Sequence, residues 1–447
     1  MDSILLKVIK LDNAGEILEG LTRPESGSAD ALKTVEAVID GIKRNGDDAL
    51  CRFIKEYDGF DAGRENIRVA GKEIKEAAQK VKKELPDLVR ALDISRKNIE
   101  SFHRSQYEHS ETSWMKEDSR GARTGQKVTP IERVGLYIPG GRYAYPSTLL
   151  MTSIPAVTAG VDSIAVCSPP DINGQIDPVM LYLCSILGIS EIYRMGGAQA
   201  IAAMAFGTSS VKKVDKIAGP GNIYVTLAKK LVYGYVGIDS LAGPSDITII
   251  ADSSARPELA AADMLSQAEH DPLSRSILLS SDRELAEQAA ECMHEMLRYY
   301  GSRKDYAGNF RVMAQSVRQQ CRIYFSPDID IIIEAANMTA PEHLEIMVSD
   351  PGHVLEGIRN AGAIFIGDNT PVAVGDYIGG TNHVIPTEGN ARFSSPLGVG
   401  DFLKRSSICT YSRAALEAER RYIEEMAGFE RLYVHRDSVR KRFERQG

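Results

Sequence analysis

The sequence lacks paired cysteines. Its cysteines number six, stand far apart and form no C-x-x-C motif. This spacing removes a thiolate zinc site from consideration and fits free, buried thiols in a reducing compartment. We therefore expect a cytoplasmic protein. The cysteines are Cys51, Cys167, Cys184, Cys292, Cys321 and Cys409.

Long apolar runs and blocks of like charge are also missing. The most apolar stretch, Ser147 to Cys167, is interrupted by Pro155 and Asp162 and is too polar to span a bilayer. The first ten residues show no small-residue cleavage site, so we expect no signal peptide. The net charge of −8 is spread along the chain, which argues against a nucleic-acid or membrane partner.

A complete dinucleotide fingerprint is absent, although three glycine turns each follow an apolar run and precede a helical segment. The turns are Ile138–Gly141, Gly196–Gln199 and Gly219–Asn222. The third turn places Tyr224 where G-x-G-x-x-G requires its last glycine. The geometry of a βα turn often requires glycine, and this requirement alone explains at least two of the three turns. If a dinucleotide binds, we expect Gln199 and Asn222 to contribute more than a fingerprint loop, with loose binding.

The length of 447 residues exceeds what one hydrophobic core usually serves. The first third has helical periodicity. From Val134 onward, short apolar runs alternate with helical segments, which indicates βαβ units and parallel sheets. The predicted class is α/β, with two Rossmann-like α/β domains that carry incomplete dinucleotide fingerprints and with small N- and C-terminal helical extensions.

The turn Gly243–Ser245 separates two α/β blocks and sets the expected boundaries. We expect an N-terminal extension over 1–29 and a discontinuous first domain over 30–135 and 246–397. The second domain, 136–245, contains the three glycine turns. The C-terminal tail, 398–447, is predicted as a loop and a helix over 412–427 that reaches a neighbouring subunit.

Four scattered segments each place a histidine beside acids, amides or tight turns. They are Ser266–His270, Pro341–Leu344, Gly375–His383 and Phe429–His435. The chain has only eight histidines, so four in such surroundings predict one site assembled by folding. Imidazole, carboxylate and amide oxygen suit zinc and supply an acid or a base nearby.

Each segment has a plainer explanation when it is taken alone. Gln267 and His270 emerge on one face near a helix end and can share a metal, but such pairs usually contact water or a carbonyl. Glu342 and His343 enter a strand and point in different directions, as a base and a water-activating carboxylate require. They also fit a polar surface loop.

The last two segments are equally open. Asp376 lies in a glycine-rich stretch and is a hard oxygen donor for zinc, although an Asx turn is the more common reason for an aspartate there. Glu430 and His435 follow the long C-terminal helix and also fit a charged helix end in solvent.

In this order, the segments resemble the histidinol dehydrogenase family over nearly the whole chain. The N-terminal helices match only in general character. The segments are Glu132–Gly141 (ERVGLYIPGG), Gly196–Ala203 (GGAQAIAA), Val214–Asn222 (VDKIAGPGN), Ala242–Asp246 (AGPSD), Leu265–His270 (LSQAEH), Pro341–Leu344 (PEHL), Gly375–Thr387 (GDYIGGTNHVIPT) and Phe393–Arg405 (FSSPLGVGDFLKR).

The resemblance implies roles for individual residues. The implied zinc ligands are Gln267, His270, Asp376 and His435, and the implied acid/base pair is Glu342 and His343. Substrate contacts are implied for Ser245, His343, His383 and Glu430 together with the four ligands. NAD contacts in the second domain are implied for Tyr137, Gln199 and Asn222. The chain departs from the family pattern at Asp246, where glutamate is expected.

The resemblance also implies an activity. It is the NAD-linked, four-electron oxidation of L-histidinol to L-histidine through bound L-histidinaldehyde, with one zinc ion per subunit. A homodimer is implied, in which the partner subunit supplies Glu430 and His435. Three alternatives remain: a related dehydrogenase of another amino alcohol or polar diol, a zinc-dependent hydrolase, and a non-catalytic zinc-binding protein.

Overall fold

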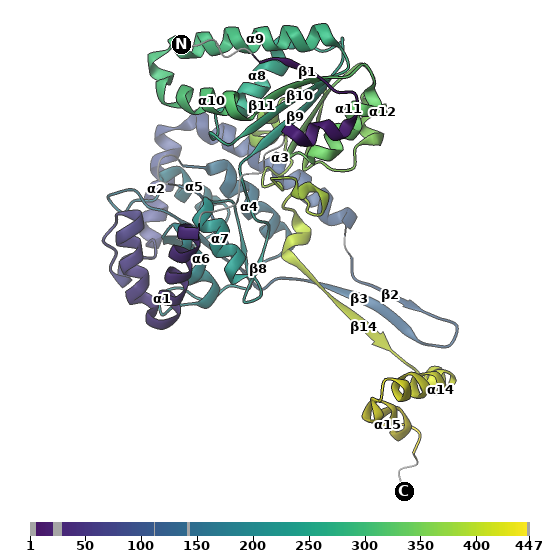
Figure 1. Cartoon of the computed structure of the whole chain (residues 1–447). Helices are drawn as coiled ribbons and strands as arrows, with labels where there is room; N and C mark the ends of the chain where they lie inside the picture. Colours follow the sequence, from purple (N-terminus) through teal and green to yellow (C-terminus); the bar gives the residue numbers. More distant parts are fainter. Residues whose placement is uncertain (1–5, 21–28, 111, 141–143, 445–447) are drawn as a thin grey trace.

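The computed structural model describes residues 6–20, 29–110, 112–140 and 144–444. These residues form two parallel sheets with their covering helices and a long antiparallel arm that projects from one side (Figure 1). The expected α/β class is confirmed. None of the helices in the described residues is both long and apolar enough to cross a membrane.

The first sheet has six parallel strands in the order β1-β11-β10-β9-β12-β13. Its central strand β9 is buried at every position, as expected for a strand covered on both faces. The strands are β1 (Val8–Lys10), β9 (Asp246–Ala251), β10 (Arg275–Ser280), β11 (Cys321–Phe325), β12 (His343–Met347) and β13 (Ala363–Ile366). The helices that follow β9 to β13 are α8 (Pro257–Ala268), α9 (Arg283–Ser302), α10 (Ala307–Gln320), α11 (Ile329–Thr339), α12 (Pro351–Gly357) and α13 (Val372–Tyr377).

The second sheet has five parallel strands in the order β6-β5-β4-β7-β8. The strand order reverses at β4, so β4 and β7 border the switch point where open α/β sheets bind ligands. The strands are β4 (Arg133–Tyr137), β5 (Ser163–Ser168), β6 (Glu191–Arg194), β7 (Lys216–Ala218) and β8 (Gly237–Ile238). The helices are α4 (Pro146–Ala159), α5 (Pro178–Ile186), α6 (Gly197–Phe206) and α7 (Ile223–Val232).

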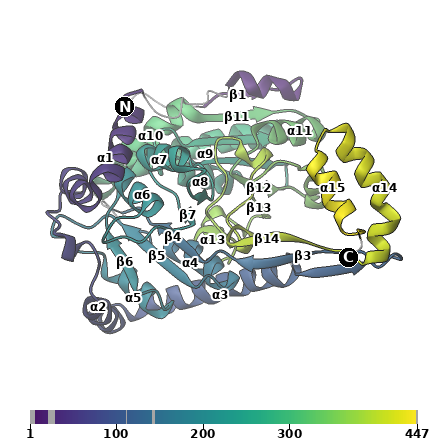
Figure 2. The ribbon, with the colours of Figure 1, turned by 90° about the horizontal axis from the view of Figure 1, so that it is seen from below.

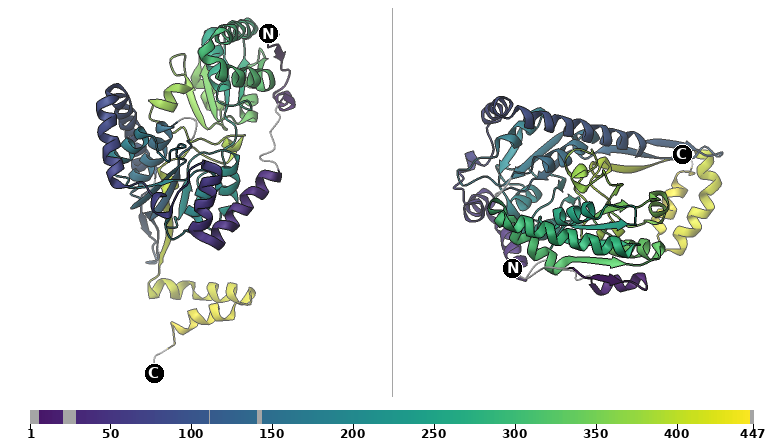
Figure 3. Two further views of the ribbon diagram at one scale, coloured as in Figure 1. Left: turned by 90° about the vertical axis from the view of Figure 1, so that its left-hand side faces the viewer. Right: turned by 90° about the horizontal axis from the view of Figure 1, so that it is seen from above.

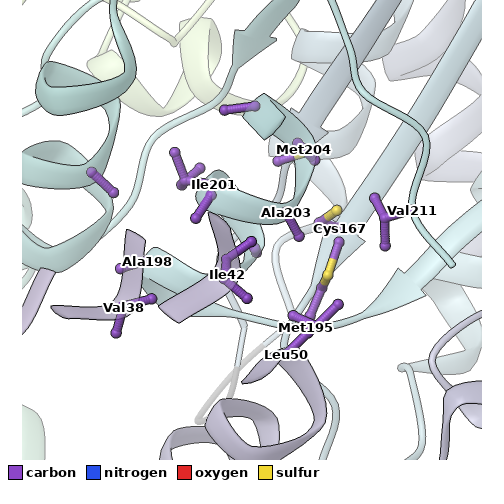
Figure 4. Close-up of a cluster of buried hydrophobic side chains, with 14 of the residues drawn as sticks. Val38, Ile42, Leu50, Cys167, Met195, Ala198, Ile201, Ala203, Met204 and Val211 are labelled. Atoms are coloured by element: carbon purple, nitrogen blue, oxygen red, sulfur yellow. The ribbon is translucent and has the colours of Figure 1, made fainter. Parts of the chain in front are cut away.

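The N-terminal helices cover the five-stranded sheet, which differs from the expected grouping of 30–135 with 246–397. They are α1 (Ala29–Phe53), the π-turn η2 (Ile54–Asp58), α2 (Gly71–Glu84) and α3 (Pro86–Ser110). Figure 4 shows Val38 and Ile42 of α1 packed near Ile201 of α6 in one apolar cluster. Helical periodicity identifies an apolar face but not which sheet it covers, and so the boundary at 135 was wrong. The turn at Gly243–Ser245 lies between β8 and β9, and these two strands belong to different sheets.

Both terminal extensions contain a strand where only helix and loop were expected. At the N-terminus, β1 adds a parallel edge strand beside β11, and Leu11 and Ile17 are buried beneath that sheet. Within the expected extension, residues 1–5 and 21–28 lie outside the described residues. At the C-terminus, the expected loop is β14 (Leu403–Thr410), which pairs with β3 (Arg123–Pro130).

The arm consists of β14, β3 and β2 (Trp114–Glu117) and ends in α14 (Arg413–Phe429) and α15 (Tyr433–Lys441). Figures 1–3 show these two helices held away from the body of the chain, at the far end of the arm. The short 3₁₀ turns are η1 (Ala14–Gly20), η3 (Arg64–Asn66), η4 (Lys304–Tyr306), η5 (Asn390–Arg392) and η6 (Val399–Phe402).

Candidate functional site

One cavity of about 260 Å³ lies between the two sheets. It faces the amino ends of strands in the six-stranded sheet, where Ser245 precedes β9 and His343 begins β12. From the other side it faces the carboxyl ends of β4 and β7, through Pro139 and Pro220. Side chains about a hundred residues apart therefore meet in one crevice.

Seven of the side chains singled out in the sequence line this cavity. They are Ser245, Gln267, His270, Glu342, His343, Asp376 and His383. The prediction that the scattered histidine segments fold together is thus confirmed for three of the four segments. The fourth segment, with Glu430 and His435, lies on the arm and does not line the cavity.

Asp246 fixes the backbone that carries the predicted acid/base pair. Its N–H donates to Glu342 Oε2 at 3.0 Å, and its Oδ1 accepts from the Glu342 N–H at 3.0 Å. Its remaining oxygen, Oδ2, pairs with Arg275 at 3.0 Å. The single departure from the family pattern therefore makes tight, reciprocal contacts in which a short carboxylate reaches the neighbouring backbone.

His343 is oriented by the same residue. Its Nδ1 lies 3.1 Å from the backbone oxygen of Asp246, and so Nδ1 carries the proton and donates. Burial lowers the pKa of His343 to about 4, with the neighbouring His270 and His383 acting in the same direction. The ring is therefore neutral at physiological pH, and Nε2 is available as a base.

The pKa of Glu342 moves in the opposite direction. Burial raises it well above the ordinary value, and the nearby carboxylates of Asp246 and Asp376 raise it further. The pKa values of these two groups, which are adjacent in the chain, thus shift in opposite directions, downward for His343 and upward for Glu342. A perturbed pair of this kind in a cleft is typical of acid–base sites.

The three predicted metal ligands of the body come from two elements. Gln267 lies in the last turn of α8, and His270 lies in the turn just past the helix, at the helix end where the sequence had placed them. Asp376 lies in the short helix α13 rather than in a glycine turn. Burial raises the pKa of Asp376 to about 6.

The donor set fits a cation. Gln267 is buried, and its Nε2 has no hydrogen-bond partner among the described residues. Amide oxygen, imidazole and carboxylate are donors that zinc accepts. Within the described part of the chain, no three His, Cys, Asp or Glu side chains form a metal-binding group. Of the expected ligands that line the cavity, His270 and Asp376 are two such side chains, and Gln267 adds one amide.

His383 is held by residues from both halves of the molecule. Its Nδ1 lies 3.1 Å from the backbone oxygen of Asp376, and its Nε2 lies 3.4 Å from Thr148 Oγ1 of α4. The adjacent Asn382 donates to the Met151 backbone oxygen at 2.7 Å. Asn382 also lies 3.3 Å from Nε2 of the buried His103, a residue of α3 that the sequence reasoning missed.

A second pocket of about 430 Å³ contains all three residues for which NAD contacts were implied, Tyr137, Gln199 and Asn222. The Tyr137 hydroxyl accepts from the Gly197 N–H at 3.1 Å. Asn222 Oδ1 accepts from two N–H groups in the first turn of α7, at 3.1 and 3.2 Å, and so caps that helix. Among the three glycine turns, Gly141 lies outside the described residues.

Asp58 also lines the second pocket, although the sequence reasoning assigned no chemistry to the N-terminal helices. Its Oδ2 accepts from Gly196 N–H at 3.0 Å and from Gln199 Nε2 at 3.1 Å. Burial raises the pKa of Asp58, and these two donors oppose the rise. No periodicity or motif marks this residue, because its partners lie about 140 positions away.

The third glycine turn separates the two pockets, and a buried ion pair holds it. Gly219 has φ of +119°, and a Cβ there would lie 2.0 Å from the Tyr137 backbone oxygen. Lys229 Nζ donates to the Gly219 oxygen at 3.0 Å, and the Gly219 N–H donates to Asp239 Oδ2 at 2.7 Å. Lys229 and Asp239 form an ion pair with side chains only 2% and 3% exposed. The pair was not found from the sequence.

The tail residues lie in a strongly exposed apolar setting. Phe429, which precedes Glu430, is 91% exposed, and Val434, which precedes His435, is 81% exposed. Large exposed apolar side chains on a projecting arm are typical of a surface that another chain covers.

Two Rossmann-like α/β domains enclose a crevice that contains an acid–base pair with shifted pKa values. This arrangement is typical of an enzyme. Comparison with known sequences identifies the family. The sequence profile described as "Histidinol dehydrogenase" matches residues 21–443. The chain belongs to the histidinol dehydrogenase family.

Individual relatives agree. The chain is 46% identical over 409 residues to histidinol dehydrogenase of Synechococcus sp., covering 92% of this chain and 91% of the relative. It is 43% identical over 439 residues to the enzyme of that name from Methanothermobacter thermautotrophicus, covering 98% and 99%. The crystal structure of histidinol dehydrogenase from Elizabethkingia anophelis superposes with a TM-score of 0.90 at 35% identity, covering 99% of both chains.

Replacement of Lys229 tests whether the buried pair holds the turn. Lys229→Met leaves the Asp239 carboxylate buried without its partner, and we expect the free energy of unfolding to fall by about 3–5 kcal/mol. Urea denaturation measures it. Lys230→Met, at the exposed neighbouring position of α7, is the matched control and should change stability by less than about 0.5 kcal/mol. Equal effects of the two changes would show that the pair is not a structural anchor.

Proposed function

We propose that this protein oxidises L-histidinol to L-histidine through bound L-histidinaldehyde, the last steps of histidine biosynthesis, with zinc and NAD. The observation that supports this most is the convergence of seven implied site residues in one cavity, next to a pocket that holds all three implied NAD contacts. Membership of the family supports the same substrate.

The residues that would hold the cofactors are distributed between the two pockets. Gln267, His270 and Asp376 would hold zinc, with His435 of a second copy, and Tyr137, Gln199 and Asn222 would contact NAD. When bound, zinc would fix the imidazole and amino nitrogens of histidinol, and NAD would accept hydride from its carbinol carbon.

The chain's own acid/base groups account for the proton transfers. His343 Nε2 accepts the hydroxyl proton of histidinol, while Nδ1 stays bound to the Asp246 backbone oxygen and keeps the ring in place. Glu342 then takes a proton from water as it adds to the aldehyde, while His343 returns its proton to the aldehyde oxygen, and this gives the hydrate that the second oxidation consumes. Ser245 and His383 line the cavity as polar contacts for the substrate.

The proposal includes a homodimer with shared active sites. Three of the four expected zinc ligands line the cavity, whereas Glu430 and His435 lie on an arm held away from it (Figure 3). A second chain that receives this arm would cover the exposed Phe429 and Val434 and complete both sites at once.

The activity is tested by following NADH absorbance with L-histidinol and counting reduced cofactor per histidine formed. We expect about two NADH per histidine, and loss of turnover after chelation with recovery on adding zinc. Asp376→Asn should lower the zinc content of the purified protein, while the exposed Asp40→Asn should not. Faster oxidation of another amino alcohol would assign a different substrate, and turnover without NAD would indicate a hydrolase.

Separate replacement of Glu342 and His343 tests their division of roles. His343→Asn should reduce both oxidations by about 10²–10⁴-fold, because the hydroxyl proton loses its acceptor. Glu342→Gln should mainly slow the oxidation of L-histidinaldehyde supplied as substrate. Each half-reaction is measured as NADH produced in a single turnover. Aldehyde oxidation at the wild-type rate in Glu342→Gln would contradict the assignment.

Hybrid dimers test whether the site is shared. Activity is measured here as histidine formed, and Glu342→Gln and His435→Asn chains should each form little histidine alone. When they are co-expressed, half of the dimers are hybrids with one intact site, so about a quarter of wild-type activity should return. Co-expression of Glu342→Gln with His343→Asn is the control and should restore nothing, because both residues come from the same body. No recovery in the first mixture would show that His435 serves its own chain.

A further inference from the structure

Asp58 is a pocket-lining carboxylate to which neither the family resemblance nor the proposed chemistry gives a role. It ends the π-turn η2, and the following Gly59 has φ of +71°, so the chain reverses direction immediately after it. One of its oxygens, Oδ2, is held by Gly196 N–H and by Gln199 Nε2. In this geometry, Oδ1 remains available to a ligand in the second pocket.

The carboxylate lies beside the carboxyl end of β5. A Cβ built on Gly196 would be 2.6 Å from Asp58 Oδ1 and 2.7 Å from Pro169 Cβ, so Asp58 and Pro169 flank the same point. Pro169 directly follows β5, the second strand of this sheet in chain order. In doubly wound dinucleotide folds, an acid at the end of the second strand accepts the 2′-hydroxyl of the adenosine ribose.

The residues that follow β5 do not supply that acid themselves. Pro169 and Pro170 come first, and the next acid, Asp171, uses Oδ1 to accept from the N–H groups of Asn173 and Gln175, at 2.9 and 2.7 Å. Asp171 does not line the pocket, whereas Asp58 does. The N-terminal region therefore places a carboxylate where a Rossmann strand would normally carry its own.

The same contacts determine where phosphate cannot bind. The N-terminus of α6, a position that attracts anions, is occupied by the Asp58 carboxylate at Gly196. The N-terminus of α7 is capped by Asn222. A phosphate placed near Gly196 would face the half-buried carboxylate of Asp58, and the two negative charges would repel each other.

We propose that Asp58 accepts a hydrogen bond from the 2′-hydroxyl of the adenosine ribose and excludes a 2′-phosphate, so that this protein selects NAD over NADP. The inference rests on the proposed function, because it concerns the cofactor of that reaction. Asp58 is thus a specificity residue in the nucleotide pocket, remote from the reacting carbon.

Three cofactors and two variants test the proposal. For NAD, NADP and NAD whose adenosine ribose is 2′-deoxy, the dissociation constant is measured by isothermal titration calorimetry without substrate, and kcat/KM is measured with L-histidinol. We expect wild-type protein to prefer NAD over NADP by about 100-fold or more, and over the deoxy analogue by about tenfold. In Asp58→Asn, the NAD/NADP ratio should fall at least about tenfold and the deoxy penalty to about twofold, because the charge that rejects phosphate and accepts the hydroxyl is gone.

Asp61→Asn is the matched control. Asp61 lies three residues further along, is exposed and pairs with Lys55 at the surface, so all three ratios should stay within twofold of wild type. If Asp58→Asn does not fold, the deoxy analogue on wild-type protein decides. Equal use of NAD and the deoxy analogue would overturn the proposal, as would an unchanged NAD/NADP ratio in a folded Asp58→Asn protein. Absence of NADH formation by wild-type protein would instead refute the proposed function.

Discussion

The reciprocal hydrogen bonds between Asp246 and Glu342 hold the amino ends of β9 and β12 together, and the rest of the site depends on this contact. One residue fixes the Glu342 backbone, accepts from His343 through its carbonyl and is itself held by Arg275. Because all these groups are buried, each unpaired donor or acceptor would be costly, and the arrangement has little freedom to change. A neutral imidazole and a carboxyl with a raised pKa are consequences of the same burial.

The fold brings strand ends of opposite polarity from the two sheets to the same cavity. The six-stranded sheet presents the amino ends of its strands, with the acid/base pair, whereas the five-stranded sheet presents carboxyl ends and the switch point between β4 and β7. The Gly219–Asn222 turn is the boundary between the two pockets, so its geometry sets their relative position. Lys229 and Asp239 fix both the N–H and the carbonyl of Gly219, and this gives the boundary its rigidity.

Buried apolar strands and the motifs rich in glycine, proline and histidine were predictable from the sequence. The runs at β4, β5 and β9 are short, apolar and flanked by turns, so their identity as buried strands follows from local composition. The edge strand β1 and the arm strand β14 were not predictable, because they are half-exposed or exposed and their residues become strands only through pairing with β11 and β3. The covering helices were found, but the sheet they cover was assigned wrongly.

The sequence by itself determined the fold class, the residue types of the site and the family, because burial patterns and motif spacing are written along the chain. Only the tertiary structure decided which of those residues meet. The structure brought Gln267, Glu342 and Asp376 to one cavity and left His435 on the arm. It also showed that Asp58 and Lys229 matter, since a side chain with partners far away in the chain has no local signature. Their hydrogen bonds form only when separate elements pack, and packing is a property of the whole fold.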